Sequence, residues 1–190
     1  MAFIPVRLTP DILMRPAAPE DAAGLSRAYG RNRDHLRPWE PRRDEGFFTP
    51  EGQSRRLRDQ LAEQHAGRLV PWVLVQEAEA GTDPEFVGTI TLSPIVLGPL
   101  RSAGVGYWIA AGQSGRGLAT AALNAVCVVA DEELGLHRIE AGTLPDNHAS
   151  PRVLAKCGFT HYGTAERYLH INGAWRDHSL FQKILNDRHA

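Results

Sequence analysis

The centre of the chain reads Trp108-Ile-Ala-Ala-Gly-Gln-Ser-Gly-Arg-Gly-Leu-Ala-Thr120. The apolar residues ending at Ile109 predict a strand, the glycines predict a turn over 114–117, and the alanine-rich segment from Leu118 predicts a helix. The first N–H groups of a helix have no partner inside it, and with the helix dipole they attract anions. Glycine at 115 and 117 lets the main chain approach a phosphate closely. The stretch is therefore either a phosphate-binding turn or an ordinary strand-to-helix connection.

Two common phosphate-binding motifs do not fit this turn. A P-loop has Lys and then Ser or Thr after its second glycine, whereas Leu118-Ala119 follow Gly117. The dinucleotide fingerprint has a third glycine where this chain has Thr120. The sequence therefore disfavours a nucleotide hydrolase and a nicotinamide-dependent enzyme.

The order of the expected elements predicts the fold class. Strands are expected over 12–15, 72–77, 86–92, 103–109 and 137–143 and on both sides of a turn at 172–173, and helices from about 20 and over 49–66, 118–134 and 149–157. Residues 31–48 are expected to be irregular, and residues 81–84 are expected to form a turn. This order, with one strand–helix–strand crossover, indicates an α+β domain with a mixed, mostly antiparallel, seven-stranded sheet flanked by helices.

The composition is that of one globular domain covering residues 1–190. Hydrophobic residues make up 43% and charged residues 23%, which are ordinary values. A net charge of −1 creates no overall field toward nucleic acid or an anionic membrane, so neither is expected as a partner. No apolar stretch approaches the roughly 18 residues of a membrane span, and the N-terminus does not resemble a secretory signal. The expected location is the cytoplasm.

The cysteine and histidine residues predict neither a disulfide framework nor a metal site. Cys127 and Cys157 fall in patterns typical of small buried hydrophobic residues. The histidines show no zinc-like spacing, and Cys157 with His161 is one isolated pair.

The turn resembles the acyl-CoA pyrophosphate loop of the GNAT acetyltransferases, Gln/Arg-x-x-Gly-x-Gly/Ala. Gly117 and Ala119 match its fourth and sixth positions, while Ser114 stands where the family prefers Gln or Arg; Gln113 or Arg116 is a candidate replacement. The resemblance implies the GNAT fold, with the sheet splayed between its fourth and fifth strands, and acetyl-CoA as co-substrate. The residues it implies for cofactor binding are Trp108, Ile109, Ser114, Gly115, Arg116, Gly117, Leu118, Ala119, Thr120, Asn147 and Lys156.

Segments 35–45, 147–159 and 168–178 resemble one branch, the ribosomal-protein N-terminal alanine acetyltransferases of the RimJ/RimL type. The resemblance implies acetyl transfer to a protein N-terminal α-amine, with a ribosomal protein as the partner. A small amine (an antibiotic, an amino acid or a polyamine) is the alternative acceptor, and a non-catalytic acyl-CoA-binding module is the alternative class. The oligomeric state stays open, a homodimer included.

Acetyl transfer needs a neutral amine, a polarised thioester and a proton donor for the thiolate. By resemblance, Asn147 holds the pantetheine arm and Ser150 protonates the thiolate, although both residue types are also common helix caps. Lys156 either contacts the CoA phosphates or lies on a solvated helix face. Glu40, between two prolines, is the candidate base, with an exposed loop carboxylate as the alternative. Asp177 and His178 are neighbours in a strand and therefore point to opposite faces.

Two further arguments concern the acceptor. Near pH 7, deprotonating an α-amine of pKa about 7.8 costs roughly 1 kcal/mol and deprotonating lysine costs roughly 4.6 kcal/mol, so a site without an obvious strong base suits an α-amine.

The buried character of the cysteines favours direct attack in a ternary complex over an acetyl-enzyme. Arginines gather between 31 and 58, and the interspersed acids favour a solvated face over a binding surface. These arginines are Arg31, Arg33, Arg37, Arg42, Arg43, Arg55, Arg56 and Arg58.

Overall fold

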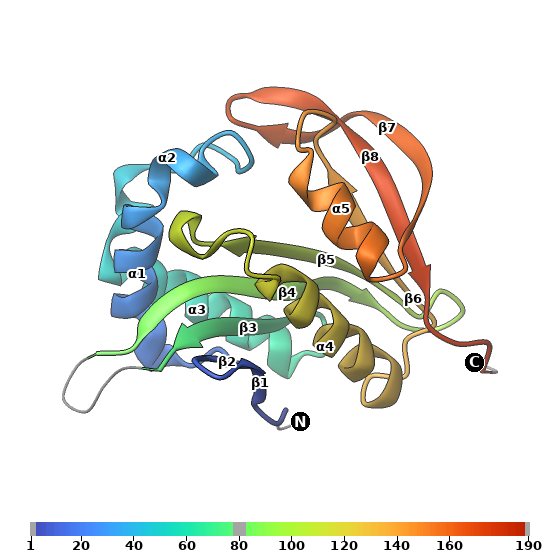
Figure 1. Cartoon of the computed structure of the whole chain (residues 1–190), viewed down its shortest axis with the longest axis horizontal. Coiled ribbons are helices and arrows are strands. Elements are labelled where there is room, and N and C mark those ends of the chain that lie inside the picture. Colours follow the sequence, from blue (N-terminus) through green and yellow to red (C-terminus); the bar gives the residue numbers. More distant parts are fainter. Residues whose placement is uncertain (1–2, 78–82, 189–190) are drawn as a thin grey trace.

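The structure, a computed structural model, describes residues 3–77 and 83–188, which form one eight-stranded sheet with helices on both faces (Figure 1). The strands are β1 (Val6–Thr9), β2 (Ile12–Pro16), β3 (Val70–Gln76), β4 (Glu85–Val96), β5 (Ser102–Ile109), β6 (Arg138–Thr143), β7 (Thr160–Ile171) and β8 (Ala174–Ile184). The α-helices are α1 (Ala22–Arg31), α2 (Arg33–Leu36), α3 (Pro50–His65), α4 (Leu118–Glu132) and α5 (Ala149–Lys156). Short 3-10 turns are η1 (Pro19–Asp21), η2 (Glu45–Phe48) and η3 (Ala111–Gln113).

The sheet runs in the order β1-β2-β3-β4-β5-β6-β8-β7, and only the β5–β6 pair is parallel. That pair is joined only where Ser102–Gly104 lies beside Arg138–Glu140. Beyond those residues the two halves of the sheet diverge, as Figure 1 shows for β5 and β8. The expected splay is therefore present between the fourth and fifth predicted strands, which are β5 and β6.

The predicted strand number of seven is wrong by one. β1 is an additional edge strand that pairs antiparallel with β2, from Val6 beside Met14 to Thr9 beside Ile12. A four-residue segment next to Pro10 carries too short a pattern to signal a strand by itself, and pairing with β2 supplies the backbone hydrogen bonds that order it.

The expectation that residues 31–48 are irregular is correct for 37–44 and wrong for the remainder. α2 and η2 lie in this segment, and Asp44 begins η2 by accepting a hydrogen bond from the Phe47 backbone at 2.9 Å. Asn32 ties the segment to the sheet, because its Oδ1 accepts from the Ala111 backbone at 2.9 Å. The sequence of this segment has no helical periodicity, and the contacts that order it are not visible in the local sequence pattern. Of the turn expected at 81–84, residues 81–82 lie outside the described residues.

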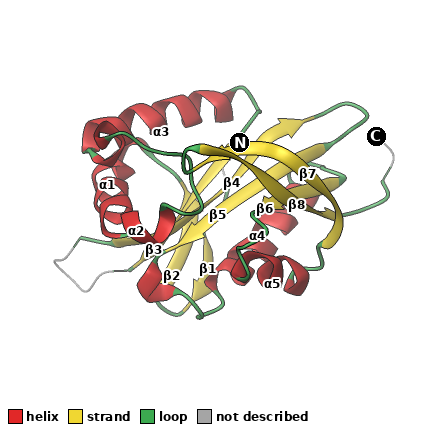
Figure 2. Ribbon diagram, turned by 90° about the horizontal axis from the view of Figure 1, so that it is seen from above, coloured by secondary structure: helices red, strands yellow, loops and turns green. Residues whose placement is uncertain are grey.

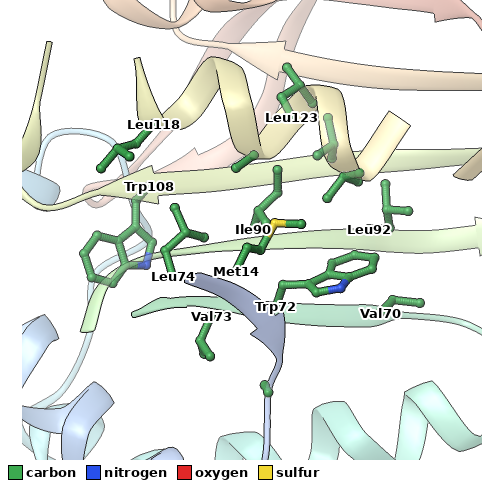
Figure 3. Packing of buried hydrophobic residues seen from close by; sticks show 14 of the residues in the cluster. Met14, Val70, Trp72, Val73, Leu74, Ile90, Leu92, Trp108, Leu118 and Leu123 are labelled. Atoms are coloured by element: carbon green, nitrogen blue, oxygen red, sulfur yellow. The ribbon is translucent and has the colours of Figure 1, made fainter. Parts of the chain in front are cut away.

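Helices α1 and α3 cover one face of the sheet, and α4 and α5 cover the other (Figure 2). The layer between the sheet and α4 contains the fully buried side chains of Met14, Ile90 and Leu123. Val73 points to the opposite face of the sheet (Figure 3). Each fully buried side chain of this kind stabilises the fold by about 1.5–3 kcal/mol. This core fixes the carboxyl end of β5 beside the start of α4.

Cys127 and Cys157 are both buried, as predicted, and burial raises the pKa of the Cys127 thiol to about 11. Across residues 3–77 and 83–188, no helix combines the length and the apolar character that crossing a membrane requires.

Candidate active site

The turn between β5 and α4 has the backbone conformation that its glycines suggest. Gly115 has φ +81° and Gly117, which precedes the first turn of α4, has φ +79°. These left-handed values are rarely adopted by other residues. Apart from the two adjoining residues in the chain, no atom of the described residues lies within 4 Å of the position that a Cβ would take at either glycine. The first N–H groups of α4 therefore lie beside open space, which fits the binding of a phosphate group.

A cavity of about 350 Å³, here called the turn cavity, extends from this turn to the start of α5. It is lined by all of the predicted cofactor residues except Arg116. Its lining residues are His35, Leu36, Trp39, Glu40, Tyr107, Trp108, Ile109, Gln113, Ser114, Gly115, Gly117, Leu118, Ala119, Thr120, Asn147, Ala149, Ser150, Arg152, Val153 and Lys156.

Arg116 points elsewhere, so its side chain is not part of the turn cavity. Its guanidinium donates to both carboxylate oxygens of Asp11 at 3.0 Å and to Gln113. The Thr9 hydroxyl and Arg116 together hold the pKa of Asp11 below its ordinary value. Gln113 lines the cavity but its amide is bonded to Gln76 at 2.9 Å. Neither candidate replacement for the usual first loop residue therefore has a free side chain.

A second cavity of about 410 Å³, here called the splay cavity, lies where β5 and β6 diverge. It is lined from α1, α3, the loop at 39–43 and the β7–β8 hairpin. Its lining residues are Tyr29, Trp39, Glu40, Arg43, Arg56, Gln60, Leu69, Thr89, Thr91, Ser93, Val105, Gly106, Tyr107, Trp108, Ala141, Gly142, Thr143, Leu144, Asn147, Ser150, Leu169, Ile171 and His178. The residues common to both cavities are Trp39, Glu40, Tyr107, Trp108, Asn147 and Ser150.

Ser150 lies at this junction and is paired with a tyrosine hydroxyl that the sequence analysis missed. The Tyr107 hydroxyl is 2.9 Å from Ser150 Oγ, across from β5 to α5. Burial raises the pKa of Tyr107 to about 12, so the phenol is neutral at pH 7. Asn147 accepts the Ser150 backbone N–H at 3.1 Å, which is the capping role expected of it. One sequence signal could have located this hydroxyl. Side chains alternate between the two faces along a strand, so if Trp108 faces α1, Tyr107 faces α5.

Glu40 is not an exposed loop carboxylate, so that alternative is wrong. Its side chain is only 22% exposed, and burial raises the pKa of its carboxyl group while Arg43 and Arg56 oppose the shift. Its backbone carbonyl accepts the Asn172 N–H at 3.0 Å, which ties the loop to the β7–β8 turn. The loop and the hairpin together place this carboxyl group at the junction of the cavities.

The prediction that Asp177 and His178 face opposite ways is confirmed. Asp177 accepts the Arg167 N–H at 2.7 Å, whereas His178 is buried and lines the splay cavity. His178 Nδ1 is 3.0 Å from the Arg176 carbonyl, and a carbonyl only accepts, so Nδ1 is the donor in this hydrogen bond. The sequence analysis did not single out His178, because it considered the histidine only as a neighbour of Asp177.

Lys156 is exposed at the end of α5 and lines the turn cavity. In residues 3–77 and 83–188, no group of three or more His, Cys, Asp or Glu side chains is arranged to hold a metal ion.

Comparison with known proteins identifies the family. The model of the acetyltransferase (GNAT) domain matches residues 11–160. The chain belongs to the GNAT acetyltransferase family. Among relatives of this GNAT protein is the [ribosomal protein uS5]-alanine N-acetyltransferase of Escherichia coli, 37% identical over 177 residues that cover 92% of this chain and 89% of that protein.

Two solved structures are similar to this GNAT protein along most of its length. The ribosomal-protein-S5-alanine acetyltransferase of Vibrio fischeri has a TM-score of 0.90 and 34% identity, covering 97% of this chain and 98% of that one. Mycobacterium smegmatis RimJ in complex with CoA-disulfide has a TM-score of 0.84 and 38% identity, covering 91% and 81%. The GNAT fold and the RimJ/RimL resemblance are therefore confirmed, and the chain is an N-acetyltransferase that uses acetyl-CoA as co-substrate.

Proposed function

We propose that this GNAT enzyme acetylates the N-terminal α-amine of a ribosomal protein, by direct attack of the amine on acetyl-CoA in a ternary complex. The observation that carries the proposal is the meeting of two cavities at Glu40, Tyr107 and Ser150. Two substrates can enter from different sides and react at that junction. The relatives named ribosomal-protein alanine acetyltransferases support the acceptor class. The proposal takes residues 1–190 as one catalytic domain and the cytoplasm as its location.

The cofactor's place in the turn cavity follows from the chemistry of its parts. The pyrophosphate accepts hydrogen bonds from the backbone of 115–120 at the N-terminus of α4. The backbone of Trp108 and Ile109 at the end of β5, beyond the last residues paired with β6, lies along the pantetheine arm; the Ile109 carbonyl is already 3.2 Å from His35 Nε2. Asn147 holds the same arm from the turn that precedes α5, and Lys156 contacts a phosphate of CoA.

Ser150 supplies the proton that the leaving thiolate needs. Its hydroxyl is hydrogen-bonded to Tyr107, whose own hydroxyl remains protonated at pH 7. A proton passes from the Ser150 hydroxyl to the sulfur, the Tyr107 hydroxyl donates a hydrogen bond to the serine oxygen that is left, and the serine then regains a proton from water. Tyr107 thereby acts through Ser150 as a positioning residue.

Glu40 accepts the proton that the acceptor ammonium loses, through a water molecule. The raised pKa of this buried carboxyl group brings its proton affinity closer to that of an α-amine, which makes proton transfer less unfavourable. An acetyl-cysteine intermediate is not needed. Cys127 and Cys157 line neither cavity, and burial raises the pKa of both thiols.

A panel of amines tests the acceptor class. Purified enzyme is mixed with acetyl-CoA and, in turn, an octapeptide with a free N-terminal alanine, the same peptide with a blocked N-terminus and one lysine, and spermidine. Thiol release and peptide mass are measured. Acetylation confined to the free α-amine supports the proposal, whereas turnover of spermidine or lysine with no turnover of the free N-terminus refutes it.

A further inference from the structure

A third cavity of about 450 Å³, here called the arginine cavity, adjoins the splay cavity. Tyr29, Glu40 and Arg43 line both. The residues that line the arginine cavity are Tyr29, Arg33, Leu36, Arg37, Glu40, Pro41, Arg42, Arg43, Phe48 and Asn172. Four guanidinium groups therefore face one carboxyl group in a space that continues directly from the proposed acceptor site.

Two of these arginines already have partners. Arg33 makes a bidentate ion pair with Glu45 and stacks over the Phe48 ring at 4.4 Å. Arg43 stacks over the Phe47 ring at 4.5 Å and lies beside Glu40. Such paired charges agree with the solvated, balanced surface that the sequence favoured.

Arg42 differs from them, because within residues 3–77 and 83–188 it has no carboxylate partner. Its guanidinium lies against the β7–β8 turn, with Cζ 2.5 Å from the position that a Cβ would take at Gly173. Only a glycine permits that approach, and Gly173 also has φ +88°. The Asn172 N–H is bonded to the Glu40 carbonyl, so this turn lies beside the loop that carries Arg42. Arg42 lines the arginine cavity, and none of the described carboxylates forms an ion pair with it. Arg42 and Arg37 are both exposed, and Arg37 is the weaker candidate because its guanidinium is 3.8 Å from the Asp34 carboxylate.

Glu40 and Arg42 line the same cavity and are two positions apart in the loop, so their Cα atoms are at most about 7.6 Å apart. If the acceptor's amine lies beside Glu40 and its chain runs into the arginine cavity, side chains at positions 2 to 4 of the acceptor are within reach of Arg42. A guanidinium binds a carboxylate through two parallel charge-assisted hydrogen bonds. An RNA backbone would need a row of free cations, whereas Glu45 already neutralises Arg33 and Glu40 lies beside Arg43.

We propose that Arg42 binds an acidic side chain at position 2, 3 or 4 of the acceptor polypeptide, so that the enzyme prefers N-termini followed by Asp or Glu. This inference rests on the proposed N-terminal acceptor and adds its charge specificity. The site is open to water, so the preference is moderate and decreases as salt screens the pair.

The experiment compares peptide substrates that differ in one charge. Octapeptides with N-terminal alanine carry Glu, Gln or Lys at position 2, 3 or 4, and kcat/KM is measured with wild-type enzyme, Arg42→Gln and Arg42→Lys. Wild type is expected to turn over the best Glu peptide about 5- to 10-fold more efficiently than its Gln counterpart, mainly through KM. Arg42→Gln is expected to reduce that ratio below 2, and Arg42→Lys to retain part of it because the charge remains.

Arg58→Gln is the matched control, because Arg58 is exposed on α3 and lines none of the three cavities. Its Glu/Gln ratio is expected to equal that of wild type. An equal turnover of Glu and Gln peptides by wild type, or an unchanged ratio in Arg42→Gln, overturns this inference while leaving the proposed function standing. Inhibition by a short RNA oligonucleotide without any Glu preference also overturns it, in favour of phosphate binding. If no peptide is acetylated at all, the proposed acceptor class is rejected and the inference falls with it.

Discussion

Replacing Ser150 with alanine tests the proton path at the junction of the cavities. The change removes the hydroxyl that lies 2.9 Å from the Tyr107 hydroxyl and leaves the Asn147 bond to the backbone of residue 150 in place. General acids contribute about 10²- to 10⁴-fold to rates. A thiolate of pKa near 8.5 is a stable leaving group, so the lower end applies. We expect kcat to fall about 100-fold, which corresponds to about 2.7 kcal/mol of transition-state stabilisation.

The same variant should keep its affinity for acetyl-CoA, because the phosphate and pantetheine contacts come from other residues. The KM for acetyl-CoA is expected to change less than about 3-fold, and the free energy of unfolding to fall by about 1 kcal/mol for the lost hydrogen bond. Thiol release under saturating acetyl-CoA gives kcat, and urea unfolding gives stability. Ser54→Ala, on α3 and outside the cavities, is the control.

Tyr107→Phe separates a proton path from simple packing. If Tyr107 acts only through Ser150, the double variant Ser150→Ala/Tyr107→Phe should be no slower than Ser150→Ala alone, while Tyr107→Phe alone loses about 10-fold. The reasoning is refuted if Ser150→Ala keeps kcat within 2-fold of wild type, or if the two substitutions multiply as independent effects.

Four further outcomes follow from substitutions at three residues. Glu40→Gln should lower peptide kcat/KM about 100-fold. It should also remove the fall in activity that occurs at low pH as the Glu40 carboxylate becomes protonated. If the pH–rate profile of Glu40→Gln is unchanged and His178→Gln shows the loss instead, His178 is the base. Because burial raises the pKa of Glu40, its ionised form disfavours the folded state above that pKa, so Glu40→Gln should melt no lower than wild type at pH 8 by calorimetry. Gly117→Ala should weaken acetyl-CoA binding about 10-fold and cost about 1 kcal/mol of stability, since φ is +79°, and Gly117→Asn should cost less; equal calorimetric Kd values for all three proteins would contradict this. Gly24→Ala should lose about 1–3 kcal/mol in urea unfolding, because a Cβ there overlaps the Phe86 ring, whereas Gly30→Ala meets no atom and serves as control; equal stability of the two variants would show that Phe86 moves aside.

The expectations that held concern patterns contained in a few neighbouring residues. The two glycines of the β5–α4 turn signal left-handed backbone by their own chemistry, and the periodicity of 118–134 requires no partner to be recognised. Element order and the single crossover then restrict the sheet to a few topologies, of which the splayed one is observed. The strand β1 and the helix α2 were missed because both are too short to carry a period and are ordered by contacts outside themselves.

The sequence by itself therefore determined the glycine turn and the crossover, because these depend on backbone conformations that local residues impose, and its motifs carried the resemblance to the family. Only the tertiary structure decided which side chains face the reacting groups. It brings the Tyr107 hydroxyl to Ser150, pairs Arg116 with Asp11, and leaves Glu40 partly buried beside a hairpin turn far along the chain. Distances between residues remote in sequence follow from how the sheet twists and packs, and no local pattern encodes them.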